Sequence, residues 1–147
     1  MKILVIGSGG REHALCWALK KSPLISKLYC APGNGGIEDV ADCVPNKAED
    51  ISAIIDFCKQ EAVDFVVIGP EGPLVMGLVD ALDDAGIKCF GPRAAAAQLE
   101  GSKGFMKDLC RTYNIPTASY QRFDNTESAK KYVESQSLPI VIKADGL

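Results

Sequence analysis

An aliphatic run that breaks off at a cluster of glycines opens this chain and sets the strongest limit on its fold. Residues 2–6 read KILVI, glycines follow at positions 7, 9 and 10, and the sequence then continues as REHAL. Such a run is typical of a strand that helices cover on both faces, and the glycines allow a sharp turn into a helix. The opening therefore predicts the strand–turn–helix unit with which a parallel α/β sheet begins.

The alternation of strand and helix continues to about residue 92. Apolar runs at residues 26–31, 63–69 and 87–91 predict three further strands. The intervening helices are predicted from apolar residues that recur at helical spacing, namely Ala14, Leu15, Ala18 and Leu19 in the first, Ile51, Ile54, Ile55, Cys58 and Ala62 in the second, and Leu74, Val75, Leu78, Ala81 and Leu82 in the third. We therefore expect residues 1–92 to form a doubly wound parallel sheet.

The pattern changes beyond residue 92, which predicts a second domain. Residues 93–102 are rich in alanine and are expected to form a connecting segment. The remaining sequence predicts a helix from residue 102 that stops before Pro116, a strand at 117–123, a helix capped by Thr126 at 125–136, and a strand at 138–146. An apolar strand with nothing after it suggests the front part of a longer protein, in which residues 103–147 are the incomplete start of the second domain.

The composition excludes several classes of partner. A formal net charge of −3 gives no general attraction to a polyanion, so no nucleic-acid partner is expected. The first apolar run is too short for a signal peptide, and no stretch is long enough to span a membrane. The six cysteines lack metal-binding spacing and favour buried free thiols in a reducing compartment. We therefore expect a cytoplasmic protein that has no membrane partner and whose cysteines do not form a metal site.

The turn at residues 7–10 is suited to binding a phosphate. Amides in the first turn of a helix have no partners within it, and glycine lets the backbone approach an anion. Arg11 could add a charged contact. A tight turn without a ligand would also use glycines, but Gly- and Pro-rich loops at residues 31–36, 69–73 and 91–92 also follow predicted strands. Because ligands of doubly wound sheets bind at this edge, we favour a site for a small phosphorylated ligand.

A nicotinamide dinucleotide is not the expected ligand. Its fingerprint requires a third glycine three residues after Gly9, where this chain has Glu12. It also requires an acidic residue near the tip of the second strand, which here reads CAPGNGG. An NAD-linked oxidoreductase is therefore the less favoured alternative. Glu12 is interpreted as a first-turn carboxylate that the helix dipole favours, not as a catalyst.

Five segments carry a specific pattern, namely GSGGREHAL, APGNGG, GPEGPLVMGLVDAL, FGPRAAAAQLEGSKGFMKDL and LPIVIKADGL. Taken together in their order and spacing, they resemble the phosphoribosylamine–glycine ligase family, also called glycinamide ribonucleotide synthetases. The resemblance implies a Rossmann-like domain followed by the beginning of an ATP-grasp domain. It also implies the ligation of glycine to 5-phosphoribosylamine in purine biosynthesis, with ATP and Mg²⁺, through a glycyl phosphate. Another ATP-grasp ligase or carboxylase of purine metabolism remains the alternative.

The resemblance assigns roles to particular residues. Phosphoribosylamine would bind at Gly7, Gly9, Gly10, Arg11, His13, Gly69, Pro70 and Glu71. The phosphates of ATP would meet Lys103 and Lys143. A lysine after four apolar strand residues, as at position 143, is costly to bury without an anion, although an edge-strand lysine can also point to solvent. The family's Mg²⁺ ligands lie beyond residue 147, so we expect no catalytic residue and no turnover in this chain alone.

Overall fold

The computed structural model describes residues 1–146, which divide into two compact units. The first unit is Met1–Ala97 and holds the sheet, while the second begins at Gln98. No helix in the described residues is both long and apolar enough to cross a membrane.

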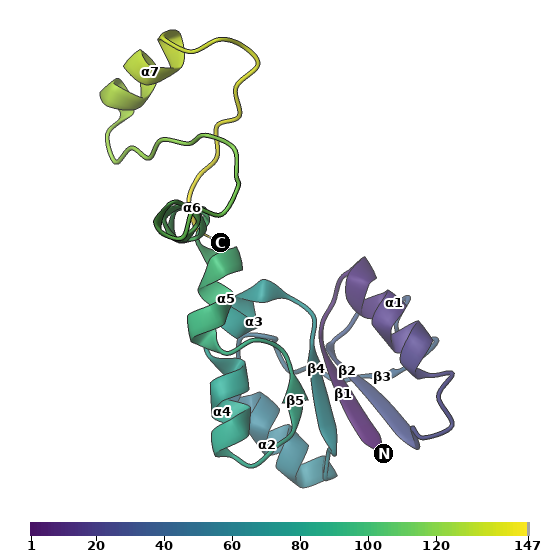
Figure 1. The fold of residues 1–147 in the computed structure, drawn as a ribbon. Helices are drawn as coiled ribbons and strands as arrows, with labels where there is room; N and C mark the ends of the chain where they lie inside the picture. The colour runs from purple at the N-terminus through teal and green to yellow at the C-terminus, as the bar shows by residue number, and fades with distance from the viewer. Residues whose placement is uncertain (147) are drawn as a thin grey trace. The chain divides into compact units, whose positions relative to one another are not determined.

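A five-stranded parallel sheet forms the centre of the first unit (Figure 1). Its strand order is β3-β2-β1-β4-β5. The strands are β1 (Lys2–Gly7), β2 (Lys27–Pro32), β3 (Asp42–Cys43), β4 (Phe65–Ile68) and β5 (Cys89–Phe90). Ile3 of β1 pairs with Leu28 on one side and with Phe65 on the other. The sheet confirms the predicted doubly wound architecture and adds β3, which is too short for a sequence pattern to indicate.

Alternate residues of β1 support two separate hydrophobic layers. Leu4 and Ile6 belong to a layer that includes Ile54 of α2 (Ile51–Glu61) and Leu82 of α4 (Leu78–Asp84). Ile3 and Val5 belong to the other layer, with Cys16 of α1 (Gly10–Leu19). Figure 1 shows α1 on one face of the sheet and α2 and α4 on the other. Because a strand directs successive side chains to opposite faces, the continuous apolar run of β1 fits its central position.

The apolar residues that predicted α1 are only in part its core side: Leu19 packs against the core and Leu15 is half-buried. Ala14 and Ala18 are exposed, whereas Glu12 and Cys16 are the buried residues of this helix. The apolar pattern failed here because a carboxylate with hydrogen-bond partners can take a buried position that sequence alone assigns to an apolar residue.

The third predicted helix is two helices in the structure. Its first part is α3 (Glu71–Val75), and its second part is α4. Gly77 lies between them with φ at +93°, a left-handed conformation that interrupts the helix. Leu78 and Leu82 are buried as expected, while Ala81 is only half-buried. In α2, Ile54 and Cys58 are buried, but Ala62 is exposed because it follows the last helical residue in a left-handed conformation.

The second unit contains helices but no strand among its described residues. The helix α5 (Ala94–Gly101) crosses the boundary at residue 97, and α6 (Lys103–Thr112) and α7 (Thr126–Glu134) follow. Asn125, not Thr126, caps α7, since its side chain accepts hydrogen bonds from Glu127 and Ser128. The strands predicted at 117–123 and 138–146 are wrong for the described residues, because a strand forms only beside a partner and none lies there.

All six cysteines are free thiols. Cys16, Cys30, Cys58 and Cys110 are buried, and Cys43 and Cys89 are partly buried. Burial raises the pKa of Cys58 to about 11. These thiols therefore pack as small apolar side chains.

Candidate functional site

The sheet brings three glycine-containing loops to one edge. Gly7 ends β1, and the amide of Gly69, directly after β4, donates to the carbonyl of Ile6 at 3.0 Å. On the other side, the amide of Gly33 donates to the carbonyl of Gly7 at 3.1 Å. The chain leaves β1 towards β2 and later returns beside β1 as β4. Gly7 and Gly69 therefore flank the switch point of the sheet, where doubly wound proteins bind their ligands.

Glu12 fills the space between Gly7 and Gly69. Only 3% of the surface of Glu12 is exposed to solvent. A Cβ added to Gly7 would lie 2.5 Å from Glu12 Cγ, and one added to Gly69 would lie 2.6 Å from the same atom. Gly7 also has φ at +128°, which side chains other than glycine rarely adopt. Both glycines are therefore required by the packing of Glu12.

The carboxylate of Glu12 holds the glycine turn and Arg11. The amide of Gly9 donates to Oε2 at 2.7 Å, and Nε of Arg11 donates to Oε1 at 2.9 Å. The other end of the Arg11 guanidinium reaches the next loop, where Nη2 donates to Oε2 of Glu71 at 3.3 Å. One arginine thus joins two carboxylates at the starts of helices that follow different strands.

The contacts between Arg11 and Glu71 favour the charged forms of these two side chains. Hydrogen bonds to Glu12 and then to Glu71 raise the pKa of Arg11. The backbone amide of Glu71 itself, followed by Arg11, lowers the pKa of Glu71. An anionic ligand at this edge therefore meets a permanently charged guanidinium, of which the side chain is 59% exposed.

The loop after β2 closes the other side of this edge. Nδ2 of Asn34 donates to the carbonyl of Ser8 at 2.6 Å, and Oδ1 accepts from the amides of Gly36 and Ile37. A Cβ on Gly36 would lie 3.0 Å from Cε1 of His13, so this histidine packs directly against the loop. Asn34 was not predicted individually. The sequence signal for it was an asparagine within a glycine-rich turn, since asparagine commonly bonds to backbone groups there.

The structure brings the eight predicted residues of the first unit to the same edge, but not with equal access. Gly7 and Gly69 are covered by Glu12, and the Gly9 amide is already paired. No atom lies within 4 Å of a Cβ placed on Gly10. Pro70 caps α3, and Glu71 begins it. The groups that remain open to a ligand are the backbone at Gly10, the outer face of Arg11 and the carboxylate of Glu71.

In the second unit, Asp145 joins the segments of the two predicted lysines. Its carboxylate accepts from the amide of Gly104 at 3.0 Å and from Oγ of Ser102 at 3.2 Å. The hydrogen bond from Gly104 is the main cause that lowers the pKa of Asp145. Lys103 begins α6, and its Nζ donates to the carbonyl of Gly146 at 3.4 Å. Lys143 is exposed and does not lie on a strand.

No group of three or more His, Cys, Asp or Glu side chains gathers within residues 1–146 in a way that could hold a metal ion. The described residues therefore do not fit a Mg²⁺ site by themselves.

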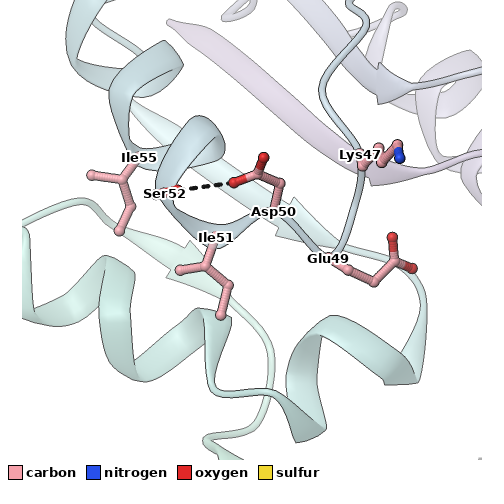
Figure 2. Close-up of a pocket in the computed structure, with 6 residues that line it drawn as sticks. All are labelled: Lys47, Glu49, Asp50, Ile51, Ser52 and Ile55. Carbon is pink, nitrogen blue, oxygen red and sulfur yellow. Dashed lines mark hydrogen bonds between the residues drawn. The ribbon is translucent and has the colours of Figure 1, made fainter.

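A hollow of about 720 Å³ lies at the start of α2, away from the predicted residues (Figure 2). It is lined by Lys47, Glu49, Asp50, Ile51, Ser52 and Ile55. Asp50 accepts from the amide of Ala53 at 3.0 Å and from Oγ of Ser52 at 2.9 Å. Its carboxylate is therefore used to cap α2, and we assign no ligand to this hollow.

The fold and the edge together define an α/β protein with a doubly wound parallel sheet, whose switch point carries an exposed arginine, followed by a second, helical unit. The family described as phosphoribosylglycinamide synthetase, N domain, matches residues 1–100, and its ATP-grasp (A) domain matches residues 101–147. The chain belongs to the phosphoribosylglycinamide synthetase family.

Curated relatives are similar along the whole chain. A phosphoribosylamine–glycine ligase of Agrobacterium fabrum is 64% identical over 147 residues, covering 100% of this chain and 35% of its own length. That of Escherichia coli strain K12 is 52% identical over 149 residues, with the same coverage of 100% and 35%. The chain thus spans about a third of the length of the curated relatives that it matches.

Solved structures share the fold. A phosphoribosylamine–glycine ligase of Thermotoga maritima superposes with a TM-score of 0.75 at 30% identity, covering 100% of this chain and 34% of its own. An N5-carboxyaminoimidazole ribonucleotide synthetase of the same organism gives a TM-score of 0.67 at 21% identity, covering 89% of this chain and 36% of its own. The second likeness, at its lower identity, is one of fold.

Proposed function

We propose that this chain is the front third of an enzyme that joins glycine to 5-phosphoribosylamine, with conversion of ATP to ADP and phosphate. The observation that carries the proposal is the 64% identity, over the whole chain, to a protein named phosphoribosylamine–glycine ligase. The reaction fits the chemistry of the substrates, because a free carboxylate does not react with an amine until a leaving group is attached. Phosphorylation of glycine by ATP would supply that leaving group.

In this proposal the first unit binds phosphoribosylamine at the edge described above. The phosphate would lie against the backbone of Gly10 and the guanidinium of Arg11, since both remain accessible there. Glu71 would accept hydrogen bonds from the ribose hydroxyls or the amine. His13, Gly7, Gly9, Gly69 and Pro70 would shape the loops around the ligand without taking up its charge.

The second unit contributes to the binding of ATP in this proposal. Lys103 and Lys143 would contact the nucleotide phosphates, and Asp145 supports the arrangement because it bonds to the segment on which Lys103 lies. Mg²⁺ would be held by residues outside this chain, and none of the chemical steps is assigned to residues 1–147.

The division of the chain is part of the same proposal. A Rossmann-like domain at residues 1–92, a connecting segment at 93–102 and an incomplete ATP-grasp domain at 103–147 are supported by the family match that ends at residue 100 and by the unit that ends at Ala97. We place the enzyme in the cytoplasm, with small molecules as its partners.

The experiment that tests the proposed reaction measures ADP release by the full-length protein. We expect ADP only when glycine and phosphoribosylamine are both present. ADP formation with bicarbonate in place of glycine would instead support the carboxylase alternative. For Lys143→Ala in the same protein, we expect much weaker ATP binding with the fold retained, and unchanged affinity in calorimetry would remove that role.

A further inference from the structure

Glu12 is a buried charge whose burial needs an explanation beyond helix capping. A carboxylate in the first turn of a helix is favoured by the dipole while exposed, so capping does not require that it be covered. Here only 3% of the residue is exposed. Burying a carboxylate is costly unless it is paired and hydrogen-bonded, and Glu12 meets that condition through the Gly9 amide and Arg11.

Glu12 lies beside the position at which doubly wound folds hold a diphosphate, because its carboxylate bonds to the Gly9 amide at the start of α1. In doubly wound folds the diphosphate lies at the N-terminus of the first helix, over the crevice at the switch point. In this chain the side chain of Glu12 packs against Gly7 and Gly69 at the switch point. A Cβ added to Gly7 would lie 2.5 Å from Glu12 Cγ, and one added to Gly69 would lie 2.6 Å from it. A diphosphate that entered the crevice would meet both a filled space and a negative charge.

Glu12 also determines which donors remain for an anion. It takes the amide of Gly9, which would otherwise be one of the unpaired first-turn donors. It fixes Nε of Arg11, so that the rest of the guanidinium extends to Glu71 on the exposed side. The exposed side of Arg11 and the exposed backbone at Gly10 therefore lie outside the space that Glu12 fills.

We propose that Glu12 is a specificity-determining residue of this site: its buried carboxylate excludes a diphosphate from the switch-point crevice and leaves room for a single phosphate beside Arg11. This inference rests on the proposed binding of phosphoribosylamine, because it concerns the selectivity of that same site.

The test measures the affinities of the 147-residue chain for ribose 5-phosphate and for ADP-ribose by calorimetry, with ADP as the control for nucleotide binding elsewhere. Glu12→Gln keeps the volume and an acceptor for Gly9 but removes the charge, while Glu12→Ala removes both volume and charge. Asp50→Asn is the matched control, since Asp50 is also a capping carboxylate but lies at α2. Circular dichroism verifies that each variant folds.

We expect the native chain to prefer ribose 5-phosphate, and this preference over ADP-ribose to fall at least tenfold in Glu12→Ala and by a smaller factor in Glu12→Gln. Asp50→Asn should leave the preference unchanged. If Glu12 had a purely structural role, its substitution would weaken the binding of both ligands by the same factor. An unchanged ratio of the two affinities in a folded Glu12→Gln chain would therefore overturn the inference. Equal binding of both ligands by the native chain would also overturn it, while the proposed function would stand. If the native chain bound no ribose 5-phosphate, the inference would fail, whereas the proposed reaction would still be decided by ADP release from the full-length protein.

Discussion

Arg11 and Glu71, which are 60 residues apart in the sequence, form an ion pair of 3.3 Å across the switch point of the sheet. The pair links the turn after β1 to the turn after β4. It also places one positive and one negative group on the exposed side of the crevice that Glu12 fills. A phosphorylated amine or sugar presents the complementary groups, a phosphate for Arg11 and hydrogen-bond donors for Glu71.

Replacing Arg11 by alanine should weaken ribose 5-phosphate binding roughly 10- to 100-fold, because a hydrogen bond to a charged group contributes about 1.5–3 kcal/mol. Calorimetry on the 147-residue chain measures this effect. Arg93→Ala is the matched control, since Arg93 is another surface arginine of the first unit and is paired with Asp83. Equal affinity of the Arg11→Ala and native chains would remove Arg11 from the site.

The Glu71 carboxylate should make stability depend on pH in the acid range. Its pKa in the folded chain lies below the ordinary 4.5, because its own backbone amide and Arg11 bond to the charged form. The stabilisation is therefore present above the unfolded-state pKa and is lost as the pH falls through the lower folded-state value. We expect Glu71→Gln to lower the melting temperature slightly at about pH 7 and to have no effect at about pH 2. A difference that grew on acidification would contradict this sign.

A methyl group at Gly69 should destabilise the first unit by about 1–3 kcal/mol, the usual cost of overpacking, because it would collide with Glu12. Gly10→Ala is the control, since the space around that position is open, and we expect a change within about 0.5 kcal/mol. Urea unfolding measures both variants. The cost of Gly69→Ala should be smaller in a Glu12→Ala background, and an equal cost there would show that another contact is responsible.

Removal of the Asp145 carboxylate should loosen the start of α6. Asp145→Ala deletes the acceptor of the Gly104 amide, and we expect hydrogen exchange at that amide to accelerate roughly tenfold, as for the loss of a helix cap. Asp124→Ala is the control, because Asp124 is an exposed aspartate of the same unit. If the exchange rate at Gly104 stayed the same, Ser102 alone would be sufficient to cap the helix.

The sequence predicted the parallel sheet well because buried strands such as Lys2–Gly7 carry an uninterrupted apolar pattern. It also predicted which loops meet at the edge, since this follows from strand direction alone. The burial of Glu12 was not predicted, because it depends on Gly69, which is distant in the sequence. The strands expected at 117–123 and 138–146 failed for a related reason: an apolar pattern reports a preference for extended structure, whereas a strand also requires a neighbour.

Strand β1 ends at the Gly7 turn, and its two sets of side chains are buried in different layers, Leu4 and Ile6 on one side and Ile3 and Val5 on the other. The height and tilt of the Gly7 turn are therefore set by the thickness of both layers at once. We therefore expect a shortened side chain at Ile54 to change the position of the Gly7 turn and, with it, that of Arg11 at the start of α1. Variation in the core would in this way alter the geometry of the sheet edge while every residue exposed there stayed the same.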